Sequence, residues 1–141
     1  MPGDIDVPGG HTVRICIPSA MTGAAADDEW SGFVTPSDTE ALVTITKATW
    51  IPSAAVAHNA AAYTTLAVRD RKADASGAEL LATRSYAAGD SVAFVAEVMT
   101  LDPTPANLVI AGGHVITVQR VHTGAGLVLP AGIVEVTYQF S

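Results

Sequence analysis

The chain has 141 residues and a formal net charge of −7, from 7 basic and 14 acidic residues. This length fits one domain whose core needs neither metal nor disulfides to be stable. So few basic residues, spread along the chain, offer no electrostatic footprint for nucleic acid and disfavour an anionic membrane surface. Hydrophobic residues make up 49% of the chain but aromatic ones only 6%, which indicates a core of small and β-branched side chains suited to packed sheets.

The N-terminal stretch MPGDIDVPGG is rich in glycine, proline and acid. This composition predicts a flexible arm over residues 1–10, ahead of a β-sandwich domain at 11–141. The stretch has acids where a secretion signal has basic residues, and no apolar segment follows it. Nor does any segment reach the roughly 20 apolar residues of a membrane span. We therefore expect no export by a visible signal.

Cys16 is the only cysteine. A single cysteine excludes an internal disulfide and indicates synthesis in a reducing compartment. It lies in the alternating run 13–17, VRICI, where free cysteine usually behaves as a small hydrophobic residue. The prediction is a buried, unreactive thiol.

Period-2 alternation of apolar and polar residues marks the strands that we expect along the chain. The last two are separated by HTGAGLVLPAG, whose glycines and proline favour a turn, and we interpret them as an antiparallel closing pair. The predicted strands cover residues 11–18, 41–50, 63–71, 80–86, 91–101, 108–110, 115–121 and 133–140.

A long connection is predicted over residues 19–39. It holds an acidic cluster, DDE at 27–29, and two large apolar residues, Trp30 and Phe33. Loops of this length in compact domains are usually functional or disordered, and a disordered linker has little use for tryptophan and phenylalanine. We expect the loop to pack either on its own domain or on a neighbouring subunit.

About eight strands, with no helix of consequence, indicate an all-β fold. The fold class expected is a single-domain antiparallel β-sandwich with an extended N-terminal arm. Because the long connections must cross between sheets, a jelly roll is favoured over a simple meander.

The four histidines are the first candidates for metal binding or acid–base chemistry. His114 and His122 lie at either end of one predicted strand, so their backbones are about 25 Å apart. No HxH, HExxH or His/Cys spacing is present. We expect solvated or locally hydrogen-bonded histidines, no metal site and no cofactor. The histidines are His11, His58, His114 and His122.

The segment DRKADASGAE at 70–79 resembles an oxygen-rich calcium loop in its spacing of acids. Arg71 and Lys72 lie inside it and would repel a cation. A hairpin turn in which Gly77 supplies a positive φ is the favoured interpretation. The oxygen-bearing residues are Asp70, Asp74, Ser76 and Glu79.

Catalytic patterns are not evident in the chain. There is no GxSxG context for a serine nucleophile and no glycine-rich phosphate loop before a helix. Glu97 and Glu135 could form a carboxylate pair, but their alternation places both on solvent faces. We expect a protein that is not an enzyme.

Several segments together resemble the capsid decoration (cement) or head-fibre-type β-sandwich virion proteins of tailed bacteriophages. They are ATWIPSAAVAHNAAAYTTLAVRDR, ADASGAELLATRSYAAGDSVAF and AGGHVITVQRVHTGAGLVLPAG. The resemblance covers residues 41–141 and depends on Trp50, Pro52, the Gly89–Asp90 turn and the run 112–130. Where such chains commonly have GD before the closing strand, this one has Gly113–His114.

The resemblance implies a protein that binds the outer surface of an icosahedral shell and stabilises it. It implies the major capsid protein as partner, a homotrimer or other small homo-oligomer, and a virion location after synthesis in the host cytoplasm. Our candidate capsid or subunit contacts are Asp4, Ile5, Val7, Trp30 and Phe33.

Two other functions stay open from the sequence. A receptor- or carbohydrate-binding module of a head or tail fibre would present an aromatic platform, and we expect Trp30 to be the exposed aromatic residue. A cupin-like jelly-roll enzyme would need metal-binding histidines on neighbouring strands. The aromatic candidates for a platform are Trp30, Trp50, Tyr63, Tyr86 and Tyr138.

Overall fold

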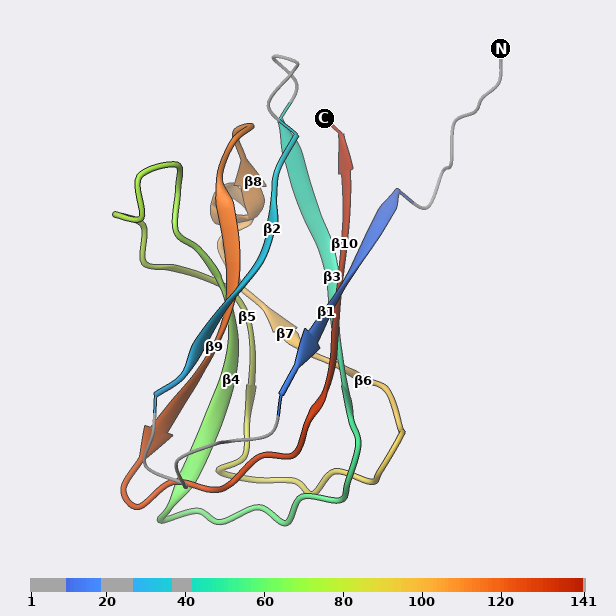
Figure 1. The fold of residues 1–141 in the computed structure, drawn as a ribbon, viewed down its shortest axis with the longest axis vertical. Coiled ribbons are helices and arrows are strands. Elements are labelled where there is room, and N and C mark those ends of the chain that lie inside the picture. The colour runs from blue at the N-terminus through green and yellow to red at the C-terminus, as the bar shows by residue number, and fades with distance from the viewer. Residues whose placement is uncertain (1–9, 19–26, 37–41, 141) are drawn as a thin grey trace.

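The computed structural model describes residues 10–18, 27–36 and 42–140 (Figure 1). These residues form ten β-strands and one short 3₁₀ turn, η1 (Pro105–Leu108). The predicted arm at 1–10 lies outside the described residues, apart from Gly10. The strands are β1 (His11–Ile17), β2 (Glu29–Val34), β3 (Val43–Pro52), β4 (Tyr63–Asp70), β5 (Glu79–Ser85), β6 (Glu97–Val98), β7 (Thr100–Leu101), β8 (Val109–Ile110), β9 (Val115–Thr123) and β10 (Gly132–Phe140).

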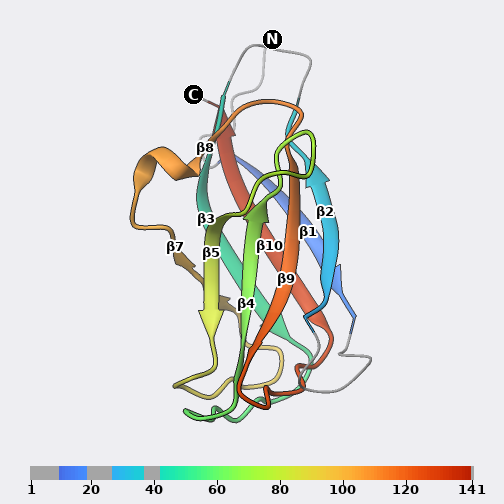
Figure 2. The ribbon, with the colours of Figure 1, turned by 90° about the vertical axis from the view of Figure 1, so that its left-hand side faces the viewer.

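The strands build two antiparallel sheets that pack face to face. Sheet A has the order β1-β10-β3-β6, with β8 also paired to β3, and sheet B has the order β2-β9-β4-β5-β7. Figure 2 looks onto sheet B, with β1, β10 and β3 crossing behind it. If the short β6 and β8 together count as the sixth strand, sheet A has the order one-eight-three-six, and the four long strands of sheet B have the order two-seven-four-five. These are the two interleaved sheets of a jelly roll, so the predicted fold class is confirmed.

The expected closing pair is wrong. β10 pairs with β1 and β3 in sheet A, whereas β9 pairs with β2 and β4 in sheet B. The connection at 124–131 spans the roughly 10 Å between the two sheets instead of folding back as a hairpin. Alternation identifies a half-buried strand, but it does not say which strand lies beside it.

The predicted long connection contains a strand, β2, which the sequence pattern did not reveal. The β2–β9 register shifts between Ser31 and Phe33, so the expected alternation is interrupted by a bulge. Gly32 lies at this shift, where a Cβ atom would come within 2.6 Å of the Ile15 side chain of β1. A Cβ would also lie 2.8 Å from the Ile116 carbonyl oxygen of β9, so the bulge of β2 requires a glycine.

The single strand expected at 91–101 is also wrong, because the segment crosses from one sheet to the other. β6 pairs with Thr49 and Trp50 of β3 in sheet A, and Met99 N–H donates to Ala48 O. β7 then pairs with β5 in sheet B. The apolar run SVAFVAEVMTL thus serves both sheets in short pieces instead of extending one of them.

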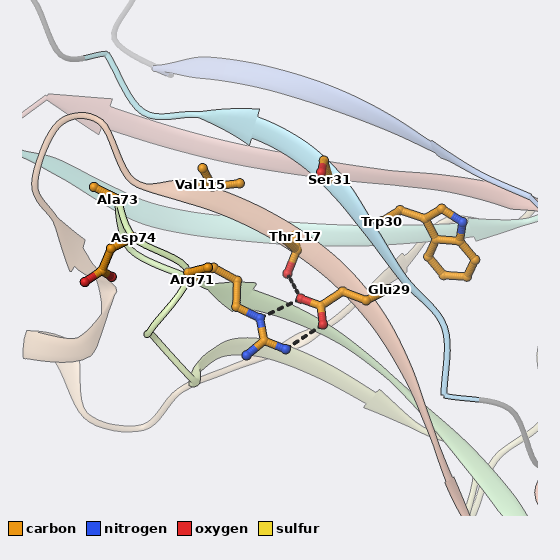
Figure 3. A pocket seen from close by; sticks show the side chains of 9 residues that line it. Glu29, Trp30, Ser31, Arg71, Ala73, Asp74, Val115 and Thr117 are labelled. Atoms are coloured by element: carbon orange, nitrogen blue, oxygen red, sulfur yellow. Dashed lines mark hydrogen bonds and ion pairs between the residues drawn. The ribbon is translucent and has the colours of Figure 1, made fainter.

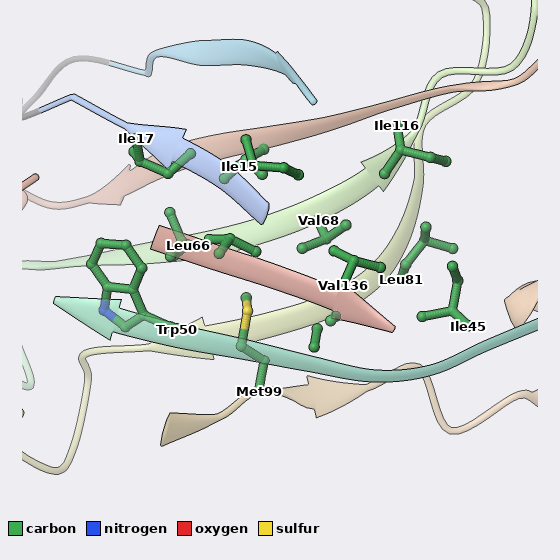
Figure 4. Close-up of a cluster of buried hydrophobic side chains, with 14 of the residues drawn as sticks. Ile15, Ile17, Ile45, Trp50, Leu66, Val68, Leu81, Met99, Ile116 and Val136 are labelled. Atoms are coloured by element: carbon green, nitrogen blue, oxygen red, sulfur yellow. The ribbon is translucent and has the colours of Figure 1, made fainter. Parts of the chain in front are cut away.

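Both sheets contribute to one hydrophobic core (Figure 4). Most of it is small or β-branched, as the composition predicts, but Trp50 and Tyr86 are fully buried as well. Gly132 of β10 accommodates the indole, since a Cβ there would lie 2.5 Å from the Trp50 ring. Buried core residues include Ile15, Ile17, Ile45, Leu66, Val68, Leu81, Ile110, Ile116, Val118, Leu129, Val134 and Val136.

Candidate functional site

A shallow groove of about 750 Å³ lies on the outer face of sheet B (Figure 3). Its floor comes from β2 and β9, and its wall from the hairpin between β4 and β5. It mixes charged, hydroxyl and apolar side chains, which suits a polar ligand better than a purely apolar one. The groove is lined by Glu29, Trp30, Ser31, Arg71, Ala73, Asp74, Ala75, Val115 and Thr117.

The floor of this groove holds an ion pair with a hydroxyl, which we call the outer cluster: Glu29, Arg71 and Thr117. Arg71 Nε donates to Glu29 Oε2 at 2.7 Å and Nη2 donates to Oε1 at 2.5 Å. Thr117 Oγ1 donates to Glu29 Oε2 at 2.5 Å. The Arg71 hydrogen bonds hold the pKa of Glu29 below its ordinary value, and the same bonds raise the pKa of Arg71. The three side chains thereby join β2, β9 and the end of β4.

The two acids that precede Glu29 are also paired. Asp27 Oδ1 lies 2.6 Å from His122 Nδ1 and accepts the His122 N–H as well, and this hydrogen bonding lowers the pKa of Asp27. Asp28 Oδ2 lies 3.0 Å from Arg120 Nη2. The acidic cluster therefore fastens the beginning of β2 along β9.

Trp30 is not the exposed aromatic platform that we expected. It is half-buried, packs against the core, and has the Arg120 guanidinium 4.4 Å from its ring centre. Figure 3 shows its ring pointing away from the Arg71–Glu29 pair. Arg120 is only 2% exposed, and burial lowers its pKa. The cation–π contact and Asp28 together compensate for this buried charge.

A second polar cluster, the inner cluster, lies at the opposite end of the sandwich. It contains Arg84, Glu97 and Ser91, backed by Tyr86 and Trp50. Trp50 Nε1 donates to Tyr86 Oη at 2.9 Å, and Tyr86 Oη lies 2.6 Å from Ser91 Oγ. Ser91 Oγ donates to Glu97 Oε2 at 2.8 Å, and Arg84 Nε donates to Glu97 Oε1 at 2.9 Å. This chain of hydrogen bonds links sheet A to the loop after β5.

The inner cluster corrects the expectation that Glu97 faces solvent. Glu97 pairs with Trp50 in the β3–β6 register and points inward, with its side chain 20% exposed. Glu135 lies on the outer face of sheet A, where Arg14 Nε is 2.6 Å from its Oε2. The two carboxylates therefore occupy opposite faces of one sheet and do not form a catalytic pair.

The histidines are dispersed. Within the described ranges, no three histidine, cysteine or acidic side chains gather in a way that could hold a metal ion. Three of the four histidines each face one aspartate through Nδ1, at distances between 2.6 and 3.0 Å, and His11 stacks on Tyr138. The pairs are His58 with Asp90, His114 with Asp70, and His122 with Asp27.

The segment at 70–79 forms the β4–β5 hairpin, as expected. The positive φ angles belong to Lys72 and Ala75, however, and not to Gly77. Gly77 is required for space instead, because a Cβ there would lie 2.5 Å from the Asp70 carbonyl oxygen. Asp70 itself is buried, and its carboxylate lies 3.0 Å from His114 Nδ1 while Oδ1 also accepts the Lys72 N–H of the hairpin at 2.8 Å.

The prediction for Cys16 is wrong as well. The thiol is exposed, since Cys16 pairs with Ile133 on the outer face of sheet A, while Ile15 and Ile17 point into the core. The alternation of the strand was read correctly, but cysteine falls on its outer side.

One end of the sandwich carries exposed aromatic side chains, and the end of β10, which bears Phe140, lies at the top of Figure 1. Tyr138 stacks on His11 at 5.4 Å and on Phe33 at 6.0 Å between ring centres, and Phe140 meets Tyr138 edge-on at 6.0 Å. Phe140 is 44% exposed, and His11 is exposed too. Exposed Val34 is the last residue of β2, and exposed Leu42 immediately precedes β3. We call this surface the aromatic end: His11, Phe33, Val34, Leu42, Tyr138 and Phe140.

Comparisons with protein-family models, with curated proteins and with solved structures found no match.

The candidate contacts predicted from the sequence fall into two groups. Asp4, Ile5 and Val7 lie outside the described residues. Trp30 and Phe33 pack against the core of their own domain, although Phe33 also belongs to the aromatic end. The described helical segment η1 is a single turn and no candidate for crossing a membrane.

Sequence reasoning missed the exposed apolar residues near β6. Val92, Phe94, Val95 and Val98 are between 49% and 75% exposed. Their signal was present, because this apolar run departs from period 2 around Phe94 and Val95. Apolar residues in an irregular strand pattern cannot all reach one core face.

Proposed function

We propose that this chain is a non-enzymatic structural protein of a phage virion. It binds the outer surface of the capsid, with the major capsid protein as its partner, and stabilises the shell after synthesis in the host cytoplasm. Support comes from the resemblance of residues 41–141 and from the jelly-roll fold, which serves virion and lectin domains alike. Fold alone does not decide function, so a surface must carry the proposal.

The aromatic end is the observation that carries it. Phe140, Val34 and Leu42 are 44%, 58% and 42% exposed. Phe140 and Val34 are the last residues of β10 and β2, and Leu42 immediately precedes β3. Apolar surface gathered on rigid elements, beside stacked rings, is typical of an interaction site. Buried against a shell, such a group would supply the apolar centre of the contact.

The polar groups favour binding over catalysis. The arginines and glutamates of the outer and inner clusters are engaged with one another, and Ser91, which donates to Glu97, is only 2% exposed. A serine nucleophile would need an accessible position beside its base. These clusters fit the role of fastening strands and loops.

Co-sedimentation with phage heads that lack this protein tests the proposal. The wild-type chain should bind heads saturably at a fixed ratio to the shell protein. Leu42→Glu and Phe140→Glu should weaken binding by about tenfold or more, because a charge would be buried at the contact. Leu80→Glu is the matched control, since Leu80 is 40% exposed but lies on β5 of sheet B.

The outcomes separate the function from the surface. Absence of wild-type binding to heads overturns the capsid function itself. Wild-type binding that Leu42→Glu and Phe140→Glu leave unchanged keeps the function but removes the aromatic end from the contact. Deletion of residues 2–10 examines the predicted arm, and unchanged binding after this deletion would remove Asp4, Ile5 and Val7 from the contact.

A second candidate function, carbohydrate or receptor binding by a fibre module, is favoured by the groove on sheet B. The outer cluster offers charged donors and acceptors there, beside Ser31 and Asp74. Because Trp30 is turned away, the groove lacks a stacking platform, and this ranks the candidate second. Binding on a glycan array that Arg71→Ala abolishes and Arg14→Ala retains would establish it over capsid decoration.

A further inference from the structure

An apolar band crosses the outer face of sheet A. Cys16 pairs with Ile133, and Ile133 pairs with Ile51, so these residues lie side by side on three strands. In the next row, Val98 of β6 pairs with Thr49 and is 67% exposed. Phe94 N–H donates to the Pro52 carbonyl at 2.8 Å, which places Phe94 beside the end of β3. We define the sheet A band as Cys16, Ile51, Phe94, Val98 and Ile133.

The band carries no unpaired charge. The charged residues in the row of Val98, Arg14 and Glu135, are joined at 2.6 Å. Glu97 lies in the same segment as Phe94 and Val98 but turns inward to Arg84. The whole chain has a formal charge of −7, so the band is an electrically neutral surface on an acidic molecule.

Phe94 is held exposed in a strained conformation. Its φ is 62°, in the left-handed region that residues other than glycine seldom adopt, at a cost on the order of 1 kcal/mol. The phenylalanine is nevertheless 75% exposed, so burial within its own chain does not offset this strain. The hydrogen bond to Pro52 fixes the backbone, and a prearranged aromatic group loses little conformational entropy on binding.

We propose that a second copy of the chain docks face to face on the sheet A band. A flat apolar β-sheet face packs best on another such face, about 10 Å away, and a two-fold contact brings the same surface from both copies. Two molecules of charge −7 repel each other, and a contact through the neutral bands adds no like-charge juxtaposition to this repulsion. The contact concerns self-association and does not depend on capsid binding.

Sedimentation velocity over a range of concentrations tests the contact. The wild-type chain should associate reversibly into pairs or a multiple of pairs. Val98→Glu and Phe94→Glu should raise the dissociation constant about tenfold or more, because each buries an unpaired charge. Val128→Glu is the matched control, since Val128 is 58% exposed and lies in the connection between β9 and β10. Circular dichroism confirms that each variant is folded.

The single cysteine gives a second, independent measurement on the wild-type chain. Cys16 lies in the band and is exposed in one copy, so its reaction with a maleimide should slow as rising concentration drives association. In Val98→Glu the rate constant should not change with concentration. This measurement decides the question even if the substituted chains fail to fold.

Two results overturn the proposal. One is a wild-type chain that stays monomeric at every concentration. If Cys16 were then protected only in the presence of phage heads, the occupant of the band would be the shell protein. The other is association that leaves Cys16 fully reactive, which would assign the contact between copies to a different surface.

Discussion

The inner and outer clusters use the same chemistry in two different surroundings. Each has an arginine–glutamate pair whose carboxylate also accepts a hydrogen bond from a hydroxyl, Ser91 in one and Thr117 in the other. The inner pair is backed by Tyr86 and Trp50, which are fully buried. The outer pair opens onto the groove of sheet B.

This difference in surroundings decides how much each ion pair contributes to the stability of the fold. If the inner carboxylate is removed, donors that face the core lose their acceptor where water cannot easily replace it. If the outer carboxylate is removed, water in the groove can hydrate the groups that remain. The inner cluster should therefore govern stability, while the outer cluster should contribute modestly and stay open to a ligand.

The strongest test of this comparison is Glu97→Ala. It leaves the Arg84 guanidinium, 16% exposed, without its ion-pair partner and Ser91 Oγ without its acceptor. We expect the free energy of unfolding to fall by about 3 kcal/mol, measured by urea denaturation.

Glu135→Ala is its control on the same sheet. Its partner Arg14 is 69% exposed, and a surface pair of this kind contributes less than about 1 kcal/mol. Equal losses in the two variants would mean that the inner cluster has no special role in stability.

A smaller effect is expected from Tyr86→Phe. The substitution keeps the ring but removes the oxygen that accepts from Trp50 Nε1 and contacts Ser91. A buried indole N–H without a partner should cost about 2 kcal/mol of unfolding free energy. Tyr63→Phe is the control, because the Tyr63 hydroxyl has no hydrogen bond to another residue that the structure describes, and it should change stability by less than about 0.5 kcal/mol. A loss in Tyr86→Phe no larger than this control would show that water replaces the missing oxygen.

Much of the fold could be predicted from local pattern. The strand at 132–140 stands out because, from Val134 onward, one face is apolar and the other polar. Turn residues between the segments gave about eight strands where the described residues form ten, and the long connections favoured a jelly roll. The neighbours of β9 and β10 could not be predicted, because the sequence pattern does not say which sheet the chain enters after residue 123.

The candidate sites were less predictable. Phe33, predicted as a contact, stacks on Tyr138 at the aromatic end, and its role as a contact stays a prediction. Trp30 was expected outside, but it is half-buried over Arg120. A buried arginine has no local sequence signal, since its burial depends on Asp28, which lies 92 residues earlier and just before β2. Cys16 was predicted to be buried and Glu97 to be exposed. Both predictions were wrong because successive side chains of a strand point to opposite faces, so an error of one residue reverses the exposure.

The smallest effect on the free energy of unfolding is expected from Glu29→Gln. The pH dependence of this effect tests the difference between the two clusters. The Arg71 hydrogen bonds lower the pKa of Glu29 in the folded chain. A lowered folded pKa means that the carboxylate stabilises the fold above the ordinary glutamate range, about 4.3, and loses this contribution as the pH falls through the lowered value.

At neutral pH the substitution should therefore cost at most about 1 kcal/mol, measured by urea denaturation. The difference from wild type should shrink below about pH 4, as Glu29 of the wild-type chain takes up a proton. Glu79→Gln, which removes an exposed acid from the start of β5, controls for the loss of one negative charge. If the difference persists at low pH, the hydrogen bond from Thr117, and not the charge of Glu29, holds β2 to β9 at the groove.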